Sequence, residues 1–327
     1  MEAARLRFAL FLCTCLTMAG ALRTAPASQT QPSLSAPQAA RAAEPPETTP
    51  ERPGTLVDVL KALRSGAASS FDDLPFQSLL EYHKAVGGQT YASISIGYNP
   101  GALRARAGTE AKPQPFAALY GLAEGALNYT FTETIDFADS GVSNASGLHV
   151  HQTGHALAPG RYRLVTGVWI SEDALAGVRT EIVDIPAFTA PELTLSSVTL
   201  ASALGSAPGA DPTLKQPFIW GNFKVVPRIE PTITRQEPLQ LYYQIYNAAH
   251  DPQSGKPRLD ITYTFFQRKL GRFQQAAQQP FRGQTSEVAL YELPLNAWPP
   301  GEFKLRIEVR DAIADTSVSR ELRFDLR

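Results

Sequence analysis

Apolar and polar residues alternate with a period of two through most of this chain, beginning near Gln89. Ala92, Ile94, Ile96 and Tyr98 alternate with small polar residues at the start of this region. Successive side chains of an extended strand point to opposite faces, so this period predicts strands with one buried and one wet face. The 26 prolines and 23 glycines among 327 residues favour short elements joined by turns. The sequence therefore predicts a mainly β fold.

The predicted strands fall into two groups separated by Pro186 and Pro191. The first group lies near residues 89–98, 127–137, 162–168 and 178–185. The second comprises Leu193–Ala201, Phe218–Val226, Leu239–Asn247, Leu259–Gln267, Phe273–Gln278, Ser286–Tyr291, Phe303–Arg310 and Ser317–Leu326. Short strands at spacings of about 10–20 residues with Gly, Pro and Asn breaks are typical of a β-sandwich.

One internal similarity indicates that the two groups are related. The segment Pro159-Gly160-Arg161-Tyr162-Arg163-Leu164 reappears as Pro300-Gly301-Glu302-Phe303-Lys304-Leu305, at an offset of 141. Each copy fits the final hairpin of an immunoglobulin-like sandwich, although two unrelated hairpins could share this pattern. We therefore predict two tandem immunoglobulin-like or fibronectin III-like β-sandwiches with a small N-terminal helical segment.

That helical segment is predicted over residues 55–88. Thr55 and Asp58 fit the start of a helix, which would run to about Ser65. A second helix is predicted from about Leu74 to Val86, where apolar residues recur at helical spacing before Gly87-Gly88. We expect both helices to pack on the first sandwich.

The N-terminus predicts a secretory signal peptide. Arg5 and Arg7 precede an apolar run from Phe8 to Leu22, which is too short for a typical membrane span. Cleavage sites are expected near Ala21 or Ala27. A retained membrane anchor is the alternative. Residues 28–54 are proline-rich and poor in apolar side chains, so we expect a disordered linker.

The predicted organisation has five parts: signal peptide 1–27, linker 28–54, helical segment 55–88, sandwich 89–190 and sandwich 191–327. Cleavage would remove the only two cysteines, Cys13 and Cys15, so thiol catalysis is excluded in the mature chain. The protein is then expected to be secreted or periplasmic, without a stable membrane span. A net charge of −1 argues against a nucleic-acid binder that relies on a basic field.

Several strand-and-turn segments resemble the β-rich portions of secreted bacterial proteins of the von Willebrand factor A-related and GWxTD types, common in acidobacteria. The resemblance covers roughly residues 89–327 and is carried by 157–164, 181–188, 193–198, 223–227 and 239–247. It implies secretion and interaction rather than a reaction.

This chain departs from those families at their metal site. The string nearest to Asp-x-Ser-x-Ser, Asp139-Ser140-Gly141-Val142-Ser143, has glycine at the central serine position, and no GWxTD pentapeptide occurs. The resemblance therefore implies the sandwich modules without the metal-binding A domain.

The sharpest chemical signal is a histidine cluster. His149, His151 and His155 are three of the five histidines and fall within seven residues. Three imidazoles can hold zinc and leave a position open for water, so a metal-binding protein or hydrolase is the alternative hypothesis. No carboxylate lies within the span to orient an imidazole, and a solvated polar loop or edge strand is the favoured interpretation.

The chain has no G-x-S-x-G elbow, phosphate-binding glycine loop or H-E-x-x-H helix. Trp169, Trp220 and Trp298 could line a carbohydrate platform but are better explained by packing. We therefore expect no catalytic residues and no cofactor. The sequence favours a non-enzymatic protein that binds a protein or cell-envelope partner through strand edges and the loops 99–115, 203–215 and 248–257.

Overall fold

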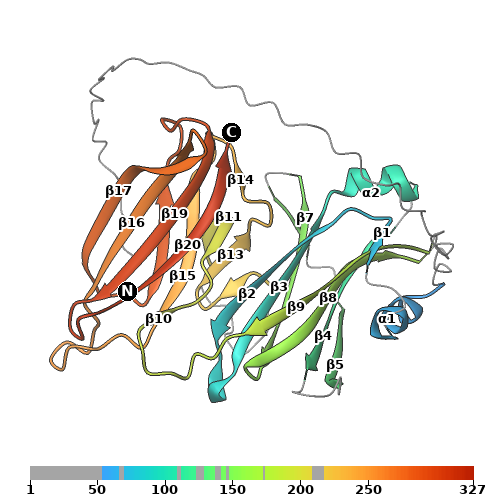
Figure 1. The fold of residues 1–327 in the computed structure, drawn as a ribbon, viewed down its shortest axis with the longest axis horizontal. Coiled ribbons are helices and arrows are strands. Elements are labelled where there is room, and N and C mark those ends of the chain that lie inside the picture. The colour runs from blue at the N-terminus through green and yellow to red at the C-terminus, as the bar shows by residue number, and fades with distance from the viewer. Residues whose placement is uncertain are drawn as a thin grey trace, which may run out of the picture. The chain divides into compact units, whose positions relative to one another are not determined.

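The chain is described here by a computed structural model covering residues 54–327 except 66–69, 109–111, 123–128, 137–140, 145–146, 172–173 and 208–216. The predicted signal peptide and nearly all of the predicted linker lie outside the described residues. The described chain is mainly β, as the alternating pattern predicts (Figure 1).

Two antiparallel sheets form the first sandwich. One has the order β1 (Phe71–Asp72), β9 (Leu175–Ile185), β8 (Gly160–Ile170), β4 (Gln114–Leu122) and β5 (Tyr129–Asp136). The other has the order β2 (Gln77–Lys84), β3 (Thr90–Tyr98), β7 (His149–Leu157) and β6 (Val142–Ser143). Alternate residues of both sheets meet in one apolar core, with Ile94 of β3 and Leu164 of β8 fully buried.

Two α-helices flank this sandwich. Helix α1 (Leu56–Ser65) starts as predicted, because the Thr55 hydroxyl accepts from the Asp58 N–H at 3.2 Å. Val59 and Leu63 pack on the outer face of β4, β8 and β9. Helix α2 (Pro100–Ala107) lies within the segment 99–115, which was predicted to be a loop. Asn99 caps it by accepting the Ala102 N–H at 3.0 Å.

The prediction of a second helix over Leu74–Val86 is wrong. That segment contains strand β2 and then a 3-10 turn, η1 (Val86–Gly88). Leu80 and Tyr82 pack against the first core, whereas Leu79 packs with residues of the second sandwich. Because both faces of β2 are covered, apolar residues occur at both parities and hide the period of two.

Two further sheets form the second sandwich. One contains β10 (Thr194–Leu195), β15 (Leu239–Tyr246), β11 (Thr199–Ser206), β13 (Phe223–Pro227) and β12 (Ile219–Trp220), with β18 (Val288–Leu293) also paired to β15. The other contains β14 (Thr232–Ile233), β20 (Thr316–Leu326), β19 (Gly301–Asp311), β16 (Leu259–Lys269) and β17 (Arg272–Gln284). Its core includes Leu241, Tyr243, Phe265, Phe303 and Phe324.

The repeated hairpin is confirmed residue by residue. Strands β8 and β19 both have 11 residues, as do their partners β9 and β20. Gly160 pairs with Ile185, and Gly301 pairs with Leu326 at the same point of the second hairpin. Both glycines have positive φ, 151° and 140°, which explains why a glycine starts each strand.

Candidate functional site

The two sandwiches meet through the outer faces of two sheets. Strands β2, β3 and β7 contribute this face from the first sandwich, and the region of β11, β12 and β13 contributes it from the second. Leu148 and Val150 share a buried cluster with Phe218, Val226 and Ile229. Burial of apolar surface therefore holds part of the interface together.

Backbone groups of the edge strand β2 are hydrogen-bonded across this interface. The Tyr82 N–H donates to the Ser197 hydroxyl at 2.8 Å, and the Tyr82 carbonyl accepts the Ser197 N–H at 2.9 Å. The Lys84 N–H donates to the Tyr246 hydroxyl at 3.0 Å. The second sandwich thus covers part of an edge that would otherwise expose unpaired backbone groups.

A carboxyl group lies inside the interface. Glu81 of β2 is 4% exposed, and its Oε1 accepts a hydrogen bond from the Thr199 hydroxyl of β11 at 2.6 Å. Burial raises the pKa of Glu81 to about 7, against a smaller opposing effect of that hydrogen bond. No basic side chain among the described residues forms an ion pair with Glu81. At this buried position the neutral, protonated form of the Glu81 carboxyl is therefore favoured over the carboxylate.

An imidazole follows two residues later on the same face of β2. His83 is 2% exposed, and its ring lies 3.9 Å from that of Trp220, centroid to centroid. Neither of its ring nitrogens has a hydrogen-bond partner among the described residues. Burial lowers the pKa of His83 to about 3, so the ring is neutral at ordinary pH.

A strained residue of the second sandwich is held by the first. Phe218 is buried and has φ of 65°, a left-handed conformation that is unfavourable for a bulky side chain. Its N–H donates to the Gln152 Oε1 of β7 at 2.7 Å. The other end of the same amide donates to the Ser95 hydroxyl at 3.3 Å. Gln152 therefore provides the acceptor for the Phe218 N–H, which lies outside the regular strand pairing.

The linker between the sandwiches is also fixed. The Thr90 hydroxyl donates to the Pro186 carbonyl. The Asn247 side chain donates to the carbonyls of Ala190 and Glu192 at 2.9 and 3.0 Å. Phe188 is buried against Tyr246. The sandwiches are thereby joined by a bonded segment as well as by their interface.

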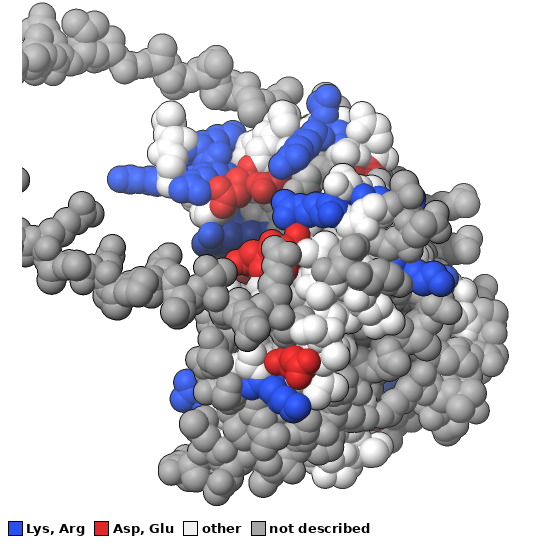
Figure 2. All heavy atoms as spheres, turned by 90° about the vertical axis from the view of Figure 1, so that its right-hand side faces the viewer, with Lys and Arg blue, Asp and Glu red and all other residues white. Residues whose placement is uncertain are grey.

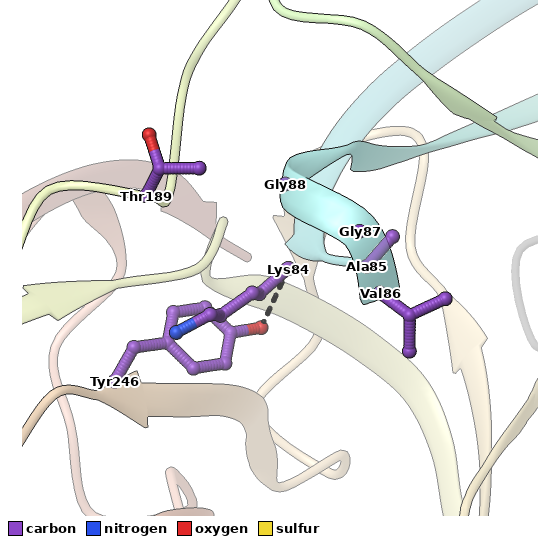
Figure 3. Close-up of a pocket in the computed structure, with 7 residues that line it drawn as sticks. All are labelled: Lys84, Ala85, Val86, Gly87, Gly88, Thr189 and Tyr246. Carbon is purple, nitrogen blue, oxygen red and sulfur yellow. Dashed lines mark hydrogen bonds between the residues drawn. The ribbon is translucent and has the colours of Figure 1, made fainter.

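A shallow cleft of about 660 Å³ lies at this junction (Figure 3). It is bounded by Lys84, the turn Ala85–Gly88, Thr189 and Tyr246. The Lys84 ammonium donates to the Asn247 side-chain oxygen at 3.0 Å, so its charge is already engaged. A second cleft of about 380 Å³ is lined mainly by apolar side chains, together with the polar residues Glu81, Ser197, Arg320 and Glu321.

The structure separates the histidine cluster. All three rings project from the same face of β7, toward the core of the first sandwich. The rings of His149 and His151 are neighbours, with centroids 4.8 Å apart. The Tyr98 hydroxyl is hydrogen-bonded to the His151 Nε2 at 3.2 Å. His155 lies four residues further along the strand, about 13 Å away at roughly 3.3 Å per residue. Among the described residues, no three His, Cys, Asp or Glu side chains are placed to hold a metal ion.

The other sequence candidates occupy structural positions. Trp169 packs under helix α1, Trp298 packs on Phe265 and Phe303, and Trp220 lies against His83 with the two rings tilted. They do not form a common platform. Asp139 and Ser140 of the string Asp139–Ser143 and part of loop 203–215 lie outside the described residues, whereas Val142 and Ser143 form strand β6.

Loop 248–257 is described completely and is internally ordered. The Asp251 Oδ1 accepts the N–H groups of Gln253 and Ser254 at 3.0 and 2.8 Å. These bonds lower the pKa of Asp251. A bridge between His250 and Pro257 closes the loop. This loop presents polar side chains from a fixed backbone, which suits recognition of a partner.

Charge is mixed on the face nearest α1 and α2, where Figure 2 shows Lys and Arg side chains interspersed with Asp and Glu. Neither of these helices is long and apolar enough to cross a membrane, and the rest of the described chain contains no such helix.

No protein-family model matches the chain, and no curated protein matches it. Among solved structures it is similar to a DUF4785 family protein from Legionella pneumophila, with 13% identity and a TM-score of 0.21. That match covers 76% of this chain and 55% of the other, so this chain spans about half its length.

Two further structures show likeness at the same level. Fibronectin(III)-like modules of Clostridium thermocellum CbhA match with 11% identity and a TM-score of 0.19, covering 76% of this chain and 94% of theirs. The chicken interferon gamma receptor alpha chain matches with 8% identity and a TM-score of 0.18, covering 77% and 98%. TM-scores of this size do not establish a common arrangement of strands.

Proposed function

We propose that this chain is a secreted or periplasmic, non-enzymatic protein whose tandem β-sandwiches bind a protein or cell-envelope surface. The observation that carries the proposal is the fixed junction between the sandwiches. Side-chain bonds from Gln152, Glu81 and Asn247 hold it across the interface and along the linker. A junction of this kind presents the end loops and edges of both sandwiches as one surface.

The chemistry of the interface supports binding over catalysis. Glu81 and His83 have strongly shifted pKa values, a feature that often marks an active site. Here, however, the carboxyl is engaged by Thr199 and the imidazole is covered by Trp220. Both side chains contact residues of the second sandwich, so their burial is explained by the packing of the two sandwiches against each other.

The secretion part of the proposal is tested by fractionation of cells that express the full chain with a C-terminal tag. We expect the protein outside the cytoplasm, with a mass that corresponds to cleavage after Ala21 or Ala27. A full-length protein confined to the cytoplasm would overturn this part.

The binding part is tested with a photo-crosslinking residue at Gln253 in the ordered loop 248–257. The matched control carries the same residue at exposed Glu308 on β19. We expect a discrete adduct with an envelope component at Gln253 and none at Glu308. Equal or absent crosslinking at both positions would contradict a role for this loop.

The alternative, a metal-binding protein or hydrolase centred on His149, His151 and His155, has its own test. The metal content of the purified protein is compared with that of a His149→Ala/His151→Ala variant. Stoichiometric zinc in the parent and none in the variant would replace the binding proposal with the metal hypothesis.

A further inference from the structure

The hairpin between β16 and β17 departs from local structural preferences at three points. Lys269 pairs with Arg272, and Leu270-Gly271 form the two-residue loop between them. Leu270 has φ of 49° and Gly271 has φ of 79°. Two-residue hairpin loops of this kind favour Asn or Asp at the first position, because leucine is disfavoured at positive φ.

The second departure is exposure. Leu270 is 100% exposed, more than any other large apolar side chain in the described chain. It makes no contribution to either core. A side chain that is both strained and fully in water is not explained by folding.

The third departure is charge. Lys269 and Arg272 face each other as a direct cross-strand pair, where like charges repel. Both are exposed, and neither has an acidic partner among the described residues. Arg268 adds a third cation one residue further on, although it pairs with Glu302 at 2.7 Å.

From these features we infer that the hairpin tip Lys269–Arg272 docks on an anionic lipid surface, with Leu270 entering the apolar layer and Lys269 and Arg272 at the headgroups. A bilayer interface has this order of layers, apolar below and negatively charged above. It also requires no complementary shape. A protein partner would need a far larger buried area than a two-residue loop offers.

The inference rests on the proposed function only in naming one envelope surface for the protein to meet. Contact through one leucine and two free cations is expected to be weak and reversible. Its charge contribution should fall steeply with salt, because the Debye length shrinks from about 10 Å at 0.1 M to about 3 Å at 1 M.

The test uses the full chain with vesicles of phosphatidylcholine, with and without about one quarter phosphatidylglycerol, an anionic lipid. Leu270→Asn restores a residue that suits the turn, so the thermal midpoint should stay the same or rise while anionic-vesicle binding falls about tenfold. Lys269→Gln/Arg272→Gln should weaken it about fivefold per charge. The matched control is Val86→Asn, since Val86 is 88% exposed at another hairpin tip.

A local readout separates the tip from the apolar run at residues 8–22, which is present in every variant. A tryptophan placed by Leu270→Trp should be quenched by brominated lipids in anionic vesicles, whereas Val86→Trp should not. Equal quenching at both positions, or none at Leu270→Trp, would overturn the inference. A different result would also overturn it: an affinity for immobilised polyglutamate equal to that for vesicles and unchanged by Leu270→Asn. That result would indicate that the tip binds an acidic protein. Because the lipids are defined, failure here leaves the fractionation and crosslinking results of the proposed function unaffected.

Discussion

The Thr199 hydroxyl donates to the Glu81 carboxyl at 2.6 Å, joining strands that are 118 residues apart and belong to different sandwiches. The carboxyl is almost fully buried, and this hydroxyl is its hydrogen-bond partner. A buried carboxyl without a cation is more stable when protonated. The stability of the junction therefore depends on pH. Ionisation of Glu81 lowers the stability as pH rises, whereas protonation of His83 on the same strand lowers it as pH falls.

The wild-type protein should have a flat stability maximum between about pH 4.5 and pH 6.5. Because the pKa of Glu81 rises from 4.5 to about 7, its contribution is complete below pH 4.5 and is lost as pH rises through 7. Because the pKa of His83 falls from 6.5 to about 3, its contribution is complete above pH 6.5 and is lost as pH falls toward 3. The two slopes cancel in between. Urea unfolding followed by tryptophan fluorescence at a series of pH values measures this profile.

Glu81→Gln should remove the loss of stability at neutral and alkaline pH. Its free energy of unfolding should rise with pH up to about 6.5 and then stay level. At pH 8 we expect a gain of up to about 3 kcal/mol, given roughly 1.4 kcal/mol for each pH unit between 4.5 and 7. Glu308→Gln, at an exposed position on β19, is the control and should leave the profile unchanged. Identical profiles for Glu81→Gln and wild type would contradict this account.

His83→Phe should remove the loss of stability in acid. The phenyl ring keeps the contact with Trp220 and has no buried nitrogens that need partners. The stability of the variant should therefore be highest below pH 4.5 and decline as Glu81 ionises. Exposed His250 offers a matched substitution, His250→Phe, for which we expect no such change. If the loss of stability at acid pH persisted in His83→Phe, a group other than His83 would be responsible for that loss.

Gln152→Ala should loosen the junction by leaving the Phe218 N–H without its acceptor. Loss of a partner from a buried donor costs about 1–3 kcal/mol. Gln152→Glu retains an oxygen at the same reach and should recover part of the loss. Protease accessibility near Phe218 and urea unfolding provide the measurements. If Gln152→Ala were as stable and as resistant to proteolysis as wild type, the bond would not hold the junction.

Gly177→Ala should be severely destabilising, by about 2–5 kcal/mol. A Cβ at this position of β9 would lie 2.0 Å from the Leu74 carbonyl oxygen, a backbone atom that has little freedom to move. Gly205→Ala on β11 is the matched control, since nothing lies within 4 Å of its Cβ position. We expect the control to be within about 0.5 kcal/mol of wild type. Similar unfolding midpoints for the two variants would refute the close approach.

The sequence pattern predicts most strands of the second sandwich, because each buries one face and leaves the other wet. The segments around Leu241, Tyr263 and Ile307 are strands as expected. Two predicted strands are divided: Leu193–Ala201 becomes β10 and β11, and Phe218–Val226 becomes the short hairpin β12–β13. Helix α2 was missed, although Asn99 followed by Pro100 is a recognisable helix start.

The candidate site was far less predictable. Glu81 and His83 are two residues apart, so on a strand they share a face that could be exposed to water. The apolar residues around Leu79 and Leu80 instead favoured a helix over this segment. Nothing in the local sequence distinguishes a side chain facing water from one facing a second module. For the histidine cluster the sequence favoured a solvated polar loop or an edge strand, with a single metal site as the alternative. The segment is instead strand β7, paired with both β3 and β6, and His151 is buried. The extended strand also places His155 far from His151.

The sequence by itself determined the β character, the duplicated hairpin and the cap at Thr55, because these depend on residue periodicity and short-range bonds. Only the tertiary structure decided that β2 is a strand covered on both faces, that Glu81 meets Thr199 and that Gln152 holds Phe218. Those contacts join residues 66 to 118 positions apart. Their energy comes from burial between two modules, which no local pattern of residues encodes.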